Sequence, residues 1–330
     1  MRVILDAFGG DNSPLEIIKG AAWAIKESDV EVILCGDEDK IKDVMEKENI
    51  SSERITIKHC TEVINGDDDP IKAVKTKKDS SIIVGLNLLK DDEGDVFISA
   101  GNTGAVFTAA NLIIKRIKGI KRSALAIYLP SENGPKLMLD AGANVTLSPE
   151  YLNQMAMMGS LYFKTDMKKD DAKVGLINIG IEETKGTETL VEAYKILKEN
   201  KDINFKGNCE PRYILSGDFD VLVCDGFTGN VMIKTLEGVS KTIMSGIKKV
   251  MTKNIITKLC SLSIKGGLSE FKKQFDYKEY GGTPIIGLKK PVIKAHGSSD
   301  KKAIKNAILN CLSYVESDII FEIEEKINKE

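Results

Sequence analysis

The sequence predicts an α/β fold in which a mostly parallel sheet is wrapped by helices. Short apolar runs alternate with amphipathic stretches of helical length along most of the 330 residues, which is the pattern of parallel βα units. No low-complexity or linker-like segment interrupts this alternation. We therefore expect residues 1–330 to form a single compact α/β unit with clefts, rather than two independently mobile domains.

The first half of the chain supplies alternating strands and helices. Val3, Ile4 and Leu5 form the first strand. A helix over 14–27 follows, with Ser13 as its N-cap and Pro14 at its first position. The remaining elements of this half, in order, are strand 30–35, helix 40–48, strand 55–57, strand 95–99 and helix 103–115.

The second half continues the same pattern. Two strands, 124–129 and 136–140, are joined by a turn over 131–135 that contains glycine and proline. The elements that follow are helix 149–163, strand 173–178, helix 188–199, strand 220–224 and a long helix over 300–327.

Composition and charge restrict the function classes. The 47 Lys and Arg residues nearly balance 49 Asp and Glu, for a formal net charge of −2, which argues against a general nucleic-acid binder. The six cysteines form no C-x-x-C pair and there are only two histidines, so we expect reduced thiols and no metal site. No signal peptide opens the chain, and no apolar run approaches the ~20 residues that span a bilayer. These features favour a cytoplasmic protein.

Glycine-rich or polar loops follow the predicted strands. In open α/β sheets, ligands bind where the strands end. Two of these loops, 101–104 and 226–229, share a form, because both follow a strand and precede a helix. Glycine lets an anion approach the backbone closely, and the helix start presents free N–H groups and a positive dipole end. The loops are 6–11, 99–104, 140–144, 178–188, 225–230 and 295–300.

This arrangement favours a phosphate or phosphorylated ligand. The alternative is that Gly, Asn and Thr serve there only as turn and cap residues. The dinucleotide and P-loop motifs are missing, as is the G-x-S-x-G signature of a serine nucleophile. The candidate phosphate-binding residues are Gly9, Gly10, Asp11, Gly101, Asn102, Thr103, Gly104, Gly142, Asn144, Thr228, Gly229, Ser298 and Ser299.

Three side chains in these loops are candidates for catalysis. Lys185 would neutralise a phosphate or stabilise an oxyanion, or else be a solvated loop lysine. Asn230 would donate an amide hydrogen bond or act as a cap. His296 would be a general acid or base, or a structural histidine that bonds its own loop. Four acids would either bind Mg²⁺ or, for several of them, hold loop N–H groups: Asp6, Asp11, Asp140 and Asp225.

Two stretches of the chain are basic and lack acids. The segment 238–269 interleaves lysines with apolar residues, which is typical of an amphipathic helix or helical hairpin that lies on anionic lipid. The alternative is a helix that packs its apolar face into a core or a dimer interface. We expect a helical protrusion over 238–276, with a tip that contacts membrane through Ile255, Ile256, Leu259 and Leu262.

The second basic stretch is shorter. It would dock an acidic partner, or simply be a lysine-rich helix end favoured by the helix dipole. Its residues are Lys115, Arg116, Lys118, Lys121 and Arg122.

Several motifs, taken together and in order, resemble the PlsX family of bacterial acyl-acyl carrier protein:phosphate acyltransferases. Phe8 is a departure, because the family usually has Met there, but both side chains are apolar. The resemblance covers residues 1 to about 315. The segments that carry it are 6–11, 98–105, 116–122, 139–145, 224–231, 280–288 and 292–300.

The resemblance implies a reaction and its setting. Inorganic phosphate would attack the thioester of a long-chain acyl-acyl carrier protein, giving acyl phosphate for phospholipid synthesis. It also implies a three-layer Rossmann-like fold resembling isocitrate and isopropylmalate dehydrogenases, a homodimer, peripheral attachment to the inner face of the cell membrane, and function at Lys185 and Asn230. A downstream glycerol-3-phosphate acyltransferase would be a further partner. No cofactor and no nucleic acid is implied.

The residues agree with this chemistry. Phosphate is itself the nucleophile, so the enzyme must hold it beside the thioester and stabilise the oxyanion, for which Lys185, Asn230 and loop N–H groups are suited. The alternatives are a phosphotransacetylase or decarboxylating dehydrogenase of the same broad fold, and a non-enzymatic scaffold at the membrane surface.

Overall fold

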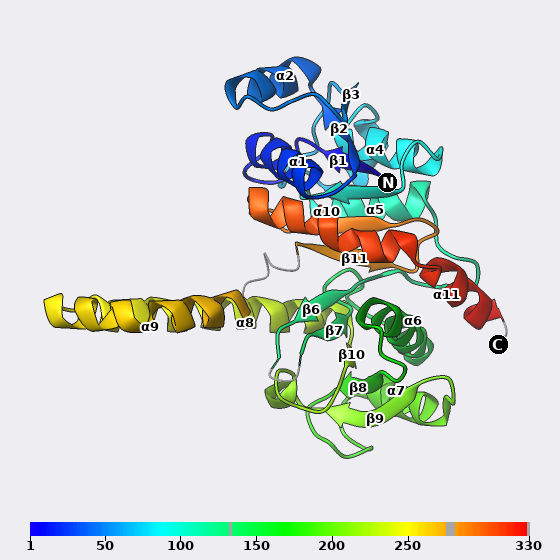
Figure 1. Cartoon of the computed structure of the whole chain (residues 1–330). Helices are drawn as coiled ribbons and strands as arrows, with labels where there is room; N and C mark the ends of the chain where they lie inside the picture. Colours follow the sequence, from blue (N-terminus) through cyan, green and yellow to red (C-terminus); the bar gives the residue numbers. More distant parts are fainter. Residues whose placement is uncertain (132–133, 275–280, 329–330) are drawn as a thin grey trace.

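The computed structural model describes residues 1–131, 134–274 and 281–328, with the side chains of 262, 265 and 268–274 outside the description. The described residues confirm the α/β fold, but the strands form two sheets (Figure 1). The helices are α1 Leu15–Glu27, α2 Glu38–Lys47, α3 Pro70–Thr76, α4 Ser81–Lys90, α5 Thr103–Ile113, α6 Pro149–Met167, α7 Glu188–Glu199, α8 Gly226–Met251, α9 Ile255–Gln274, α10 Lys301–Glu316 and α11 Ile319–Asn328.

The first sheet has seven strands in the order β3-β2-β1-β4-β12-β11-β5. The five strands from β3 to β12 are parallel, and β11 runs antiparallel to both of its neighbours. The strands are β1 Arg2–Asp6, β2 Glu31–Gly36, β3 Ile55–His59, β4 Val96–Ser99, β5 Ala124–Leu125, β11 Gly282–Ile286 and β12 Val292–Ala295.

Helices cover both faces of this sheet because successive strand residues point to opposite sides. Val3 and Leu5 of β1 belong to a core cluster with residues of α1 and α10. Ile4, between them, belongs to a second cluster with residues of α4 and α5. The strands are therefore apolar on both faces, as expected for a buried parallel sheet.

The second sheet has five strands in the order β6-β7-β10-β8-β9 and is parallel except for β6. Its strands are β6 Ile127–Leu129, β7 Lys136–Leu139, β8 Lys173–Ile177, β9 Asn204–Cys209 and β10 Val221–Val223. The predicted strand 124–129 is wrong as one strand, since β5 and β6 belong to different sheets. The chain crosses from one sheet to the other at Ala126.

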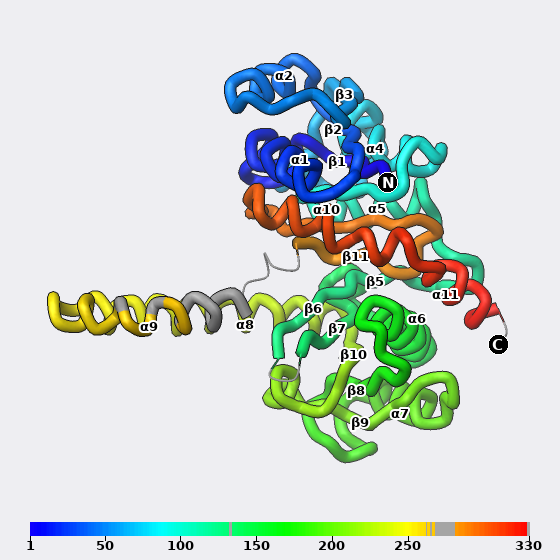
Figure 2. Tube along the Cα trace, viewed as in Figure 1, coloured from blue at the N-terminus to red at the C-terminus, as the bar shows by residue number. Residues whose placement is uncertain are grey.

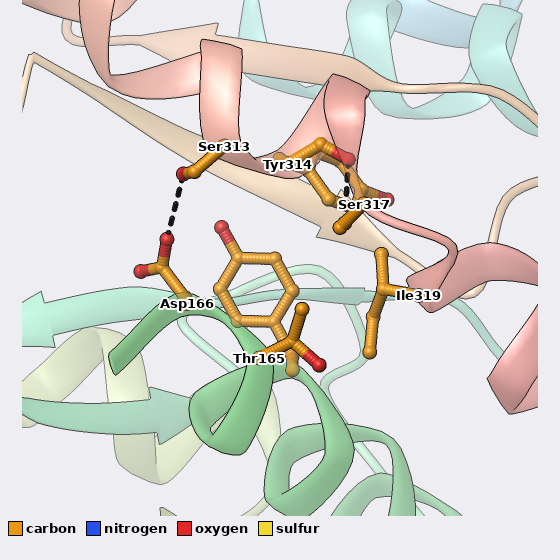
Figure 3. Close-up of a pocket in the computed structure, with 7 residues that line it drawn as sticks. Thr165, Asp166, Ser313, Tyr314, Ser317 and Ile319 are labelled. Atoms are coloured by element: carbon orange, nitrogen blue, oxygen red, sulfur yellow. Dashed lines mark hydrogen bonds between the residues drawn. The ribbon is translucent and has the colours of Figure 1, made fainter. Parts of the chain in front are cut away.

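The two sheets share one core. A single cluster of buried side chains includes Val3 and Leu5 of the first sheet together with Leu137 and Leu176 of the second. The helices α6 and α10 also meet between the sheets (Figure 3), where the rings of Tyr162 and Tyr314 lie with centroids 5.3 Å apart. These contacts support our proposal that the chain is one unit with clefts.

The helices α8 and α9 stand out from the body of the molecule (Figure 2). The helix α8 runs outward, and α9 returns beside it. This helical hairpin begins 12 residues before the expected protrusion at 238, and residues 275 and 276 of that expectation lie outside the described residues.

Other expectations about elements were wrong or incomplete. The predicted helix 300–327 is two helices, because Ser317 has an extended backbone (ψ 152°) between α10 and α11. Ser13 does not cap α1, since its hydroxyl donates to the carbonyls of Phe8 and Gly10 instead. Five elements of the structure were not predicted from the sequence: α3, α4, β9, β11 and β12.

Candidate active site

Three loops meet at the carboxyl edge of the first sheet, after β1, β4 and β12. The N–H of Asp11 donates to the carbonyl of Gly297 at 2.8 Å. A Cβ on Gly9 would lie 2.6 Å from the backbone N of Gly101, and Gly10 has φ +90° and backs onto the carbonyl of Gly297. Side chains at Gly9 and Gly10 would therefore force these loops apart. The structure brings these predicted phosphate-binding positions together.

Asp6 organises the loops from beneath. Its carboxylate accepts hydrogen bonds from the hydroxyls of Ser81 and Ser99, both at 2.6 Å, and from the N–H of Phe8 at 3.2 Å. Ser99 in turn accepts the N–H of Gly101 at 3.0 Å. Burial raises the pKa of Asp6 above its ordinary value, although these hydrogen bonds lower it. Asp6 therefore holds N–H groups of the loops, directly and through Ser99, which is the alternative to Mg²⁺ binding.

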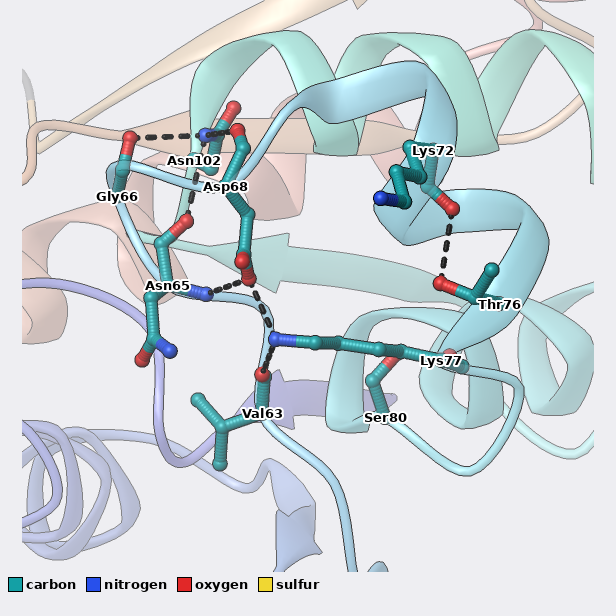
Figure 4. Close-up of polar contacts among 9 residues, drawn as sticks. All are labelled: Val63, Asn65, Gly66, Asp68, Lys72, Thr76, Lys77, Ser80 and Asn102. Carbon is teal, nitrogen blue, oxygen red and sulfur yellow. Dashed lines mark hydrogen bonds and ion pairs between the residues drawn. The ribbon is translucent and has the colours of Figure 1, made fainter.

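Asn102 fixes a neighbouring segment rather than facing a ligand with its side chain (Figure 4). Its Oδ1 caps α5 by accepting the N–H of Ala105 at 3.0 Å. Its Nδ2 donates to backbone carbonyls, including that of Gly66 at 3.0 Å. The same segment is held by an ion pair of 2.5 Å between Lys77 and Asp68. Thr103 begins α5, so the N–H groups of this turn remain the candidate anion donors.

A second group of loops lies at the carboxyl edge of the other sheet. The carboxylate of Asp140 accepts N–H groups of its own loop, including that of Asn144 at 2.6 Å. Asp225 caps α8 by accepting the N–H of Thr228 at 2.7 Å. A Cβ on Gly229 would lie 2.0 Å from the carbonyl oxygen of Asp140. Both acids hold backbone groups, and within the described residues no three His, Cys, Asp or Glu side chains gather to hold a metal.

Asn144 is also committed to structure. Its side chain is buried, and its Nδ2 donates at 2.8 Å both to Asp140 and to the carbonyl of Ser123. The amide therefore ties two loops together, as Asn102 does at the other edge.

Asn230 is exposed and lies beside a glycine. A Cβ on Gly142, which has φ +130°, would lie 3.1 Å from the Asn230 Nδ2. The two residues line a groove of about 490 Å³ together with exposed apolar side chains. Those apolar side chains are Val145, Phe227 and Val231. Asn230 thus presents an exposed amide beside the apolar wall of this groove.

His296 connects the two groups of loops. Its Nδ1 accepts the N–H of Ser298 at 3.1 Å, and its Nε2 lies 3.9 Å from Glu237 of α8. Burial lowers the pKa of His296, and Glu237 opposes this effect. Because Nδ1 accepts a hydrogen bond, we assign the proton of the neutral ring to Nε2, so the ring presents an N–H donor on the side of Glu237.

The face of α8 that meets His296 also carries Asn230. Asn230, Lys234 and Glu237 are spaced as neighbours on one helix face. Asn230 and Glu237 are seven residues apart, which corresponds to about 10 Å along the helix. Because His296 lies beside Glu237, His296 and Asn230 are on the same side of α8. Lys234 pairs with Glu237 at 3.0 Å.

Lys185 lies in the exposed loop after β8. The carbonyl of Lys185 accepts a hydrogen bond from Asn178 at 3.0 Å, and its side-chain stem passes over Gly180. Since β8 pairs with β10, this loop stands next to the one that leads to Asn230. The groove beside Asn230 does not include Lys185.

Ser299 and Lys294 are buried polar groups at the first edge. The hydroxyl of Ser299, which the sequence predicts to bind phosphate, is buried and has no hydrogen-bond partner among the described residues. An unsatisfied buried hydroxyl is costly unless a ligand or water pairs with it. The sequence reading missed Lys294, whose signal was a lysine inside an otherwise apolar strand.

The two basic surfaces are placed as follows. The residues 115–122 form a loop after the end of α5, so the interpretation of this stretch as a lysine-rich helix end is wrong. The basic side chains of the loop are exposed, whereas Ile117 and Ile120 are buried. On the hairpin, Ile255, Ile256 and Leu259 are 77%, 72% and 63% exposed. The side chain of Leu262 lies outside the description. None of the described helices is long and apolar enough to cross a bilayer.

Comparison with solved structures supports the fold. A phosphotransacetylase from Streptococcus pyogenes matches 96% of this chain and 94% of its own, with a TM-score of 0.65 at 19% identity. The EutD phosphotransacetylase from Staphylococcus aureus gives a TM-score of 0.61 at 17% identity, over 96% of this chain and 94% of its own. At these identities the likeness concerns the fold.

Sequence relatives are much closer. A phosphate acyltransferase of Clostridium perfringens is 48% identical over all of this chain and 97% of its own length. One from Thermoanaerobacter pseudethanolicus is 47% identical over 99% of this chain and 97% of its own. The family model described as "Fatty acid synthesis protein" matches residues 1–321. These matches confirm the resemblance to the PlsX family: the chain belongs to that family, and it is an acyltransferase of fatty acid or phospholipid synthesis.

Proposed function

We propose that the protein transfers a long-chain acyl group from acyl carrier protein to inorganic phosphate, and so supplies acyl phosphate for phosphatidic acid synthesis. A phosphate oxygen attacks the thioester carbonyl carbon, a C–O bond forms, and the C–S bond breaks. The proton of the phosphate passes to the leaving thiolate, giving free carrier protein. The observation that carries the phosphate half is the meeting of the three loops after β1, β4 and β12, the third of which holds the buried Ser299 hydroxyl that has no hydrogen-bond partner among the described residues.

The remaining groups have roles in the same step. Asn230 and Lys185 stabilise the oxyanion, because an amide N–H donor and an ammonium at strand ends favour developing negative charge. His296 donates from Nε2, as its Nδ1 is occupied by the Ser298 N–H. The apolar groove beside Asn230 receives the acyl thioester. Close placement of phosphate and thioester supplies much of the rate enhancement.

The surfaces have separate partners in this proposal. The basic loop 115–122 docks the acidic carrier protein, since exposed charges guide association with a partner of opposite charge. The hairpin tip binds the anionic inner face of the membrane, where lysines and exposed isoleucines act together. The protein acts as a homodimer and passes its product to a glycerol-3-phosphate acyltransferase.

The test is a phosphate-dependent assay of palmitoyl-carrier protein consumption with direct detection of acyl phosphate. We expect equal amounts of acyl phosphate and free carrier protein, and no consumption when phosphate is omitted. Acetyl-CoA and palmitoyl-CoA serve as competing donors, and preference for either over palmitoyl-carrier protein would contradict the proposed donor. Consumption without phosphate would indicate hydrolysis and contradict the proposed acceptor.

A further inference from the structure

Lys294 is a charged residue in the interior of the first sheet. It is 7% exposed and lies on β12, beside Ser99 of β4 in the parallel register. Ser99 bonds Asp6 of β1. The three residues therefore form one polar row across adjacent strands, directly under the loops after β1, β4 and β12.

The surroundings of Lys294 only partly compensate its charge. Its ammonium donates to the carbonyl of the next residue, Ala295. The carboxylates of Asp6 and Asp11 favour its charged form, yet burial is the larger effect and lowers its pKa to about 8. A buried ammonium with incomplete compensation destabilises a fold. A lysine that lowers stability at a strand end below a ligand site is a candidate for a functional role.

The two acids whose charges favour the charged form of Lys294 lie at the end of β1 and in the loop that follows it. Asp6 holds the N–H of Phe8 and, through Ser99, the N–H of Gly101. The backbone N–H of Asp11, not its carboxylate, connects the first loop to the third at Gly297. The charge of Lys294 thus acts on Asp6, the carboxylate that fixes the first and second loops.

We propose that Lys294 is a positioning residue for the phosphate substrate: its buried charge acts on the carboxylate of Asp6, and through it sets the loops after β1 and β4 in the arrangement that binds phosphate. This inference rests on the proposed function, because it needs phosphate to be the ligand of these loops. It adds a residue that does not touch the acyl donor and acts only on the phosphate half of the site.

The experiment compares the wild type with Lys294→Met and Lys294→Gln, both uncharged, and with Lys26→Met as the control. Lys26 is exposed in the last turn of α1. The Michaelis constants for phosphate and for palmitoyl-carrier protein are measured separately, with Tm for each protein. We expect the KM for phosphate to rise about tenfold or more in both Lys294 variants. The KM for palmitoyl-carrier protein should not change, the Tm of the Lys294 variants should not fall, and Lys26→Met should match the wild type.

A second measurement does not depend on turnover. Inorganic phosphate that binds the folded protein raises its Tm, and we expect this rise in the wild type and in Lys26→Met but not in the Lys294 variants. An unchanged KM for phosphate, or a parallel increase in both KM values, would overturn the inference. It is also overturned if neither Lys294 variant folds, because the residue then serves stability.

The two proposals fail in different ways. If the wild type makes no acyl phosphate but phosphate still raises its Tm, and only the Lys294 variants lose that rise, the proposed activity is wrong and the positioning role stands. If phosphate raises no Tm in the wild type, both are wrong.

Discussion

Removing the charge of Lys294 should stabilise the protein in a pH-dependent way. Its pKa in the folded protein is about 8, against an ordinary value of 10.5. The gap corresponds to about 3 kcal/mol of free energy of unfolding that the charged lysine costs at neutral pH. Between pH 8 and 10.5 the unfolded chain binds more protons than the folded chain, so the cost disappears as pH rises.

The substitution Lys294→Met isolates this effect. Methionine keeps an unbranched side chain in the buried space, and Asp6 keeps its three hydrogen-bond donors. We expect the variant to be more stable than the wild type by up to about 3 kcal/mol at pH 7, and by only about 1 kcal/mol at pH 9.5. Lys294→Met should therefore be more stable than the wild type and bind phosphate less well.

Urea unfolding followed by circular dichroism at pH 7, 8, 9 and 9.5 measures this difference. Buried thiols such as Cys224 and Cys311 also change the stability in alkali, because burial raises their pKa values. Both proteins contain them, so their contribution cancels in the comparison. A difference between the two proteins that stays constant over this pH range would contradict a lowered pKa of Lys294 as its cause, as would a variant that loses stability at pH 7.

Five further variants test other parts of the structure. Lys185→Ala should lower kcat/KM for acyl phosphate formation roughly 10²- to 10³-fold, measured in the phosphate-dependent assay. Gly229→Ala should cost roughly 1–3 kcal/mol in urea unfolding, because its Cβ would meet a backbone carbonyl at 2.0 Å; Gly238→Ala, with no atom within 4 Å, should be neutral or stabilising. Ile256→Glu should weaken sedimentation with anionic vesicles roughly tenfold. Arg116→Glu should raise the KM for palmitoyl-carrier protein about threefold without altering the KM for phosphate.

Matched surface variants make these outcomes specific. Lys195→Ala changes an exposed lysine on α7, and equal losses of kcat/KM at both lysines would contradict the catalytic role of Lys185. Phe321→Glu adds the same charge at a side chain 66% exposed on α11. If Phe321→Glu reduced vesicle binding as much as Ile256→Glu, the hairpin tip would not be the part of the protein that contacts the membrane. Arg212→Glu serves the same purpose for carrier docking, and equal KM values in both arginine variants would assign docking elsewhere.

Local signals predicted elements whose ends are set by nearby residues. The predicted helix 188–199 has the same bounds as α7, whose start is fixed by Thr187, which accepts the N–H of Leu190. The strands β11 and β12 were missed, since they are short and one carries Lys294 among apolar residues. The division of 124–129 between two sheets depends on partners distant in the sequence, so no local pattern could show it.

The same distinction applies to the site. Glycine and capping residues were identifiable because loops need them wherever strands lead into helices. The sequence did not indicate which of those residues use their side chains only to hold other segments of the chain. Asn102 and Asn144 use their amides to tie down other segments, and the bond from Ser81 to Asp6 spans 75 positions of sequence. Such roles come from the packing of α4 and β4 against β1, which composition and spacing do not specify.

The helix α8 joins the proposed site to the exposed hairpin. Its first turns carry Asn230, its middle carries Glu237 beside His296, and its end leads to the exposed tip at Ile255. A helix of 26 residues at about 1.5 Å per residue spans roughly 39 Å without a break. The helix α8 therefore links the turn before the tip to Asn230 and to Glu237, which lies beside His296, in one unbroken element. Vesicle binding and the KM for the acyl donor should consequently be measured together in any hairpin variant, because the proposed membrane tip and the proposed oxyanion donor Asn230 lie at opposite ends of this hairpin arm.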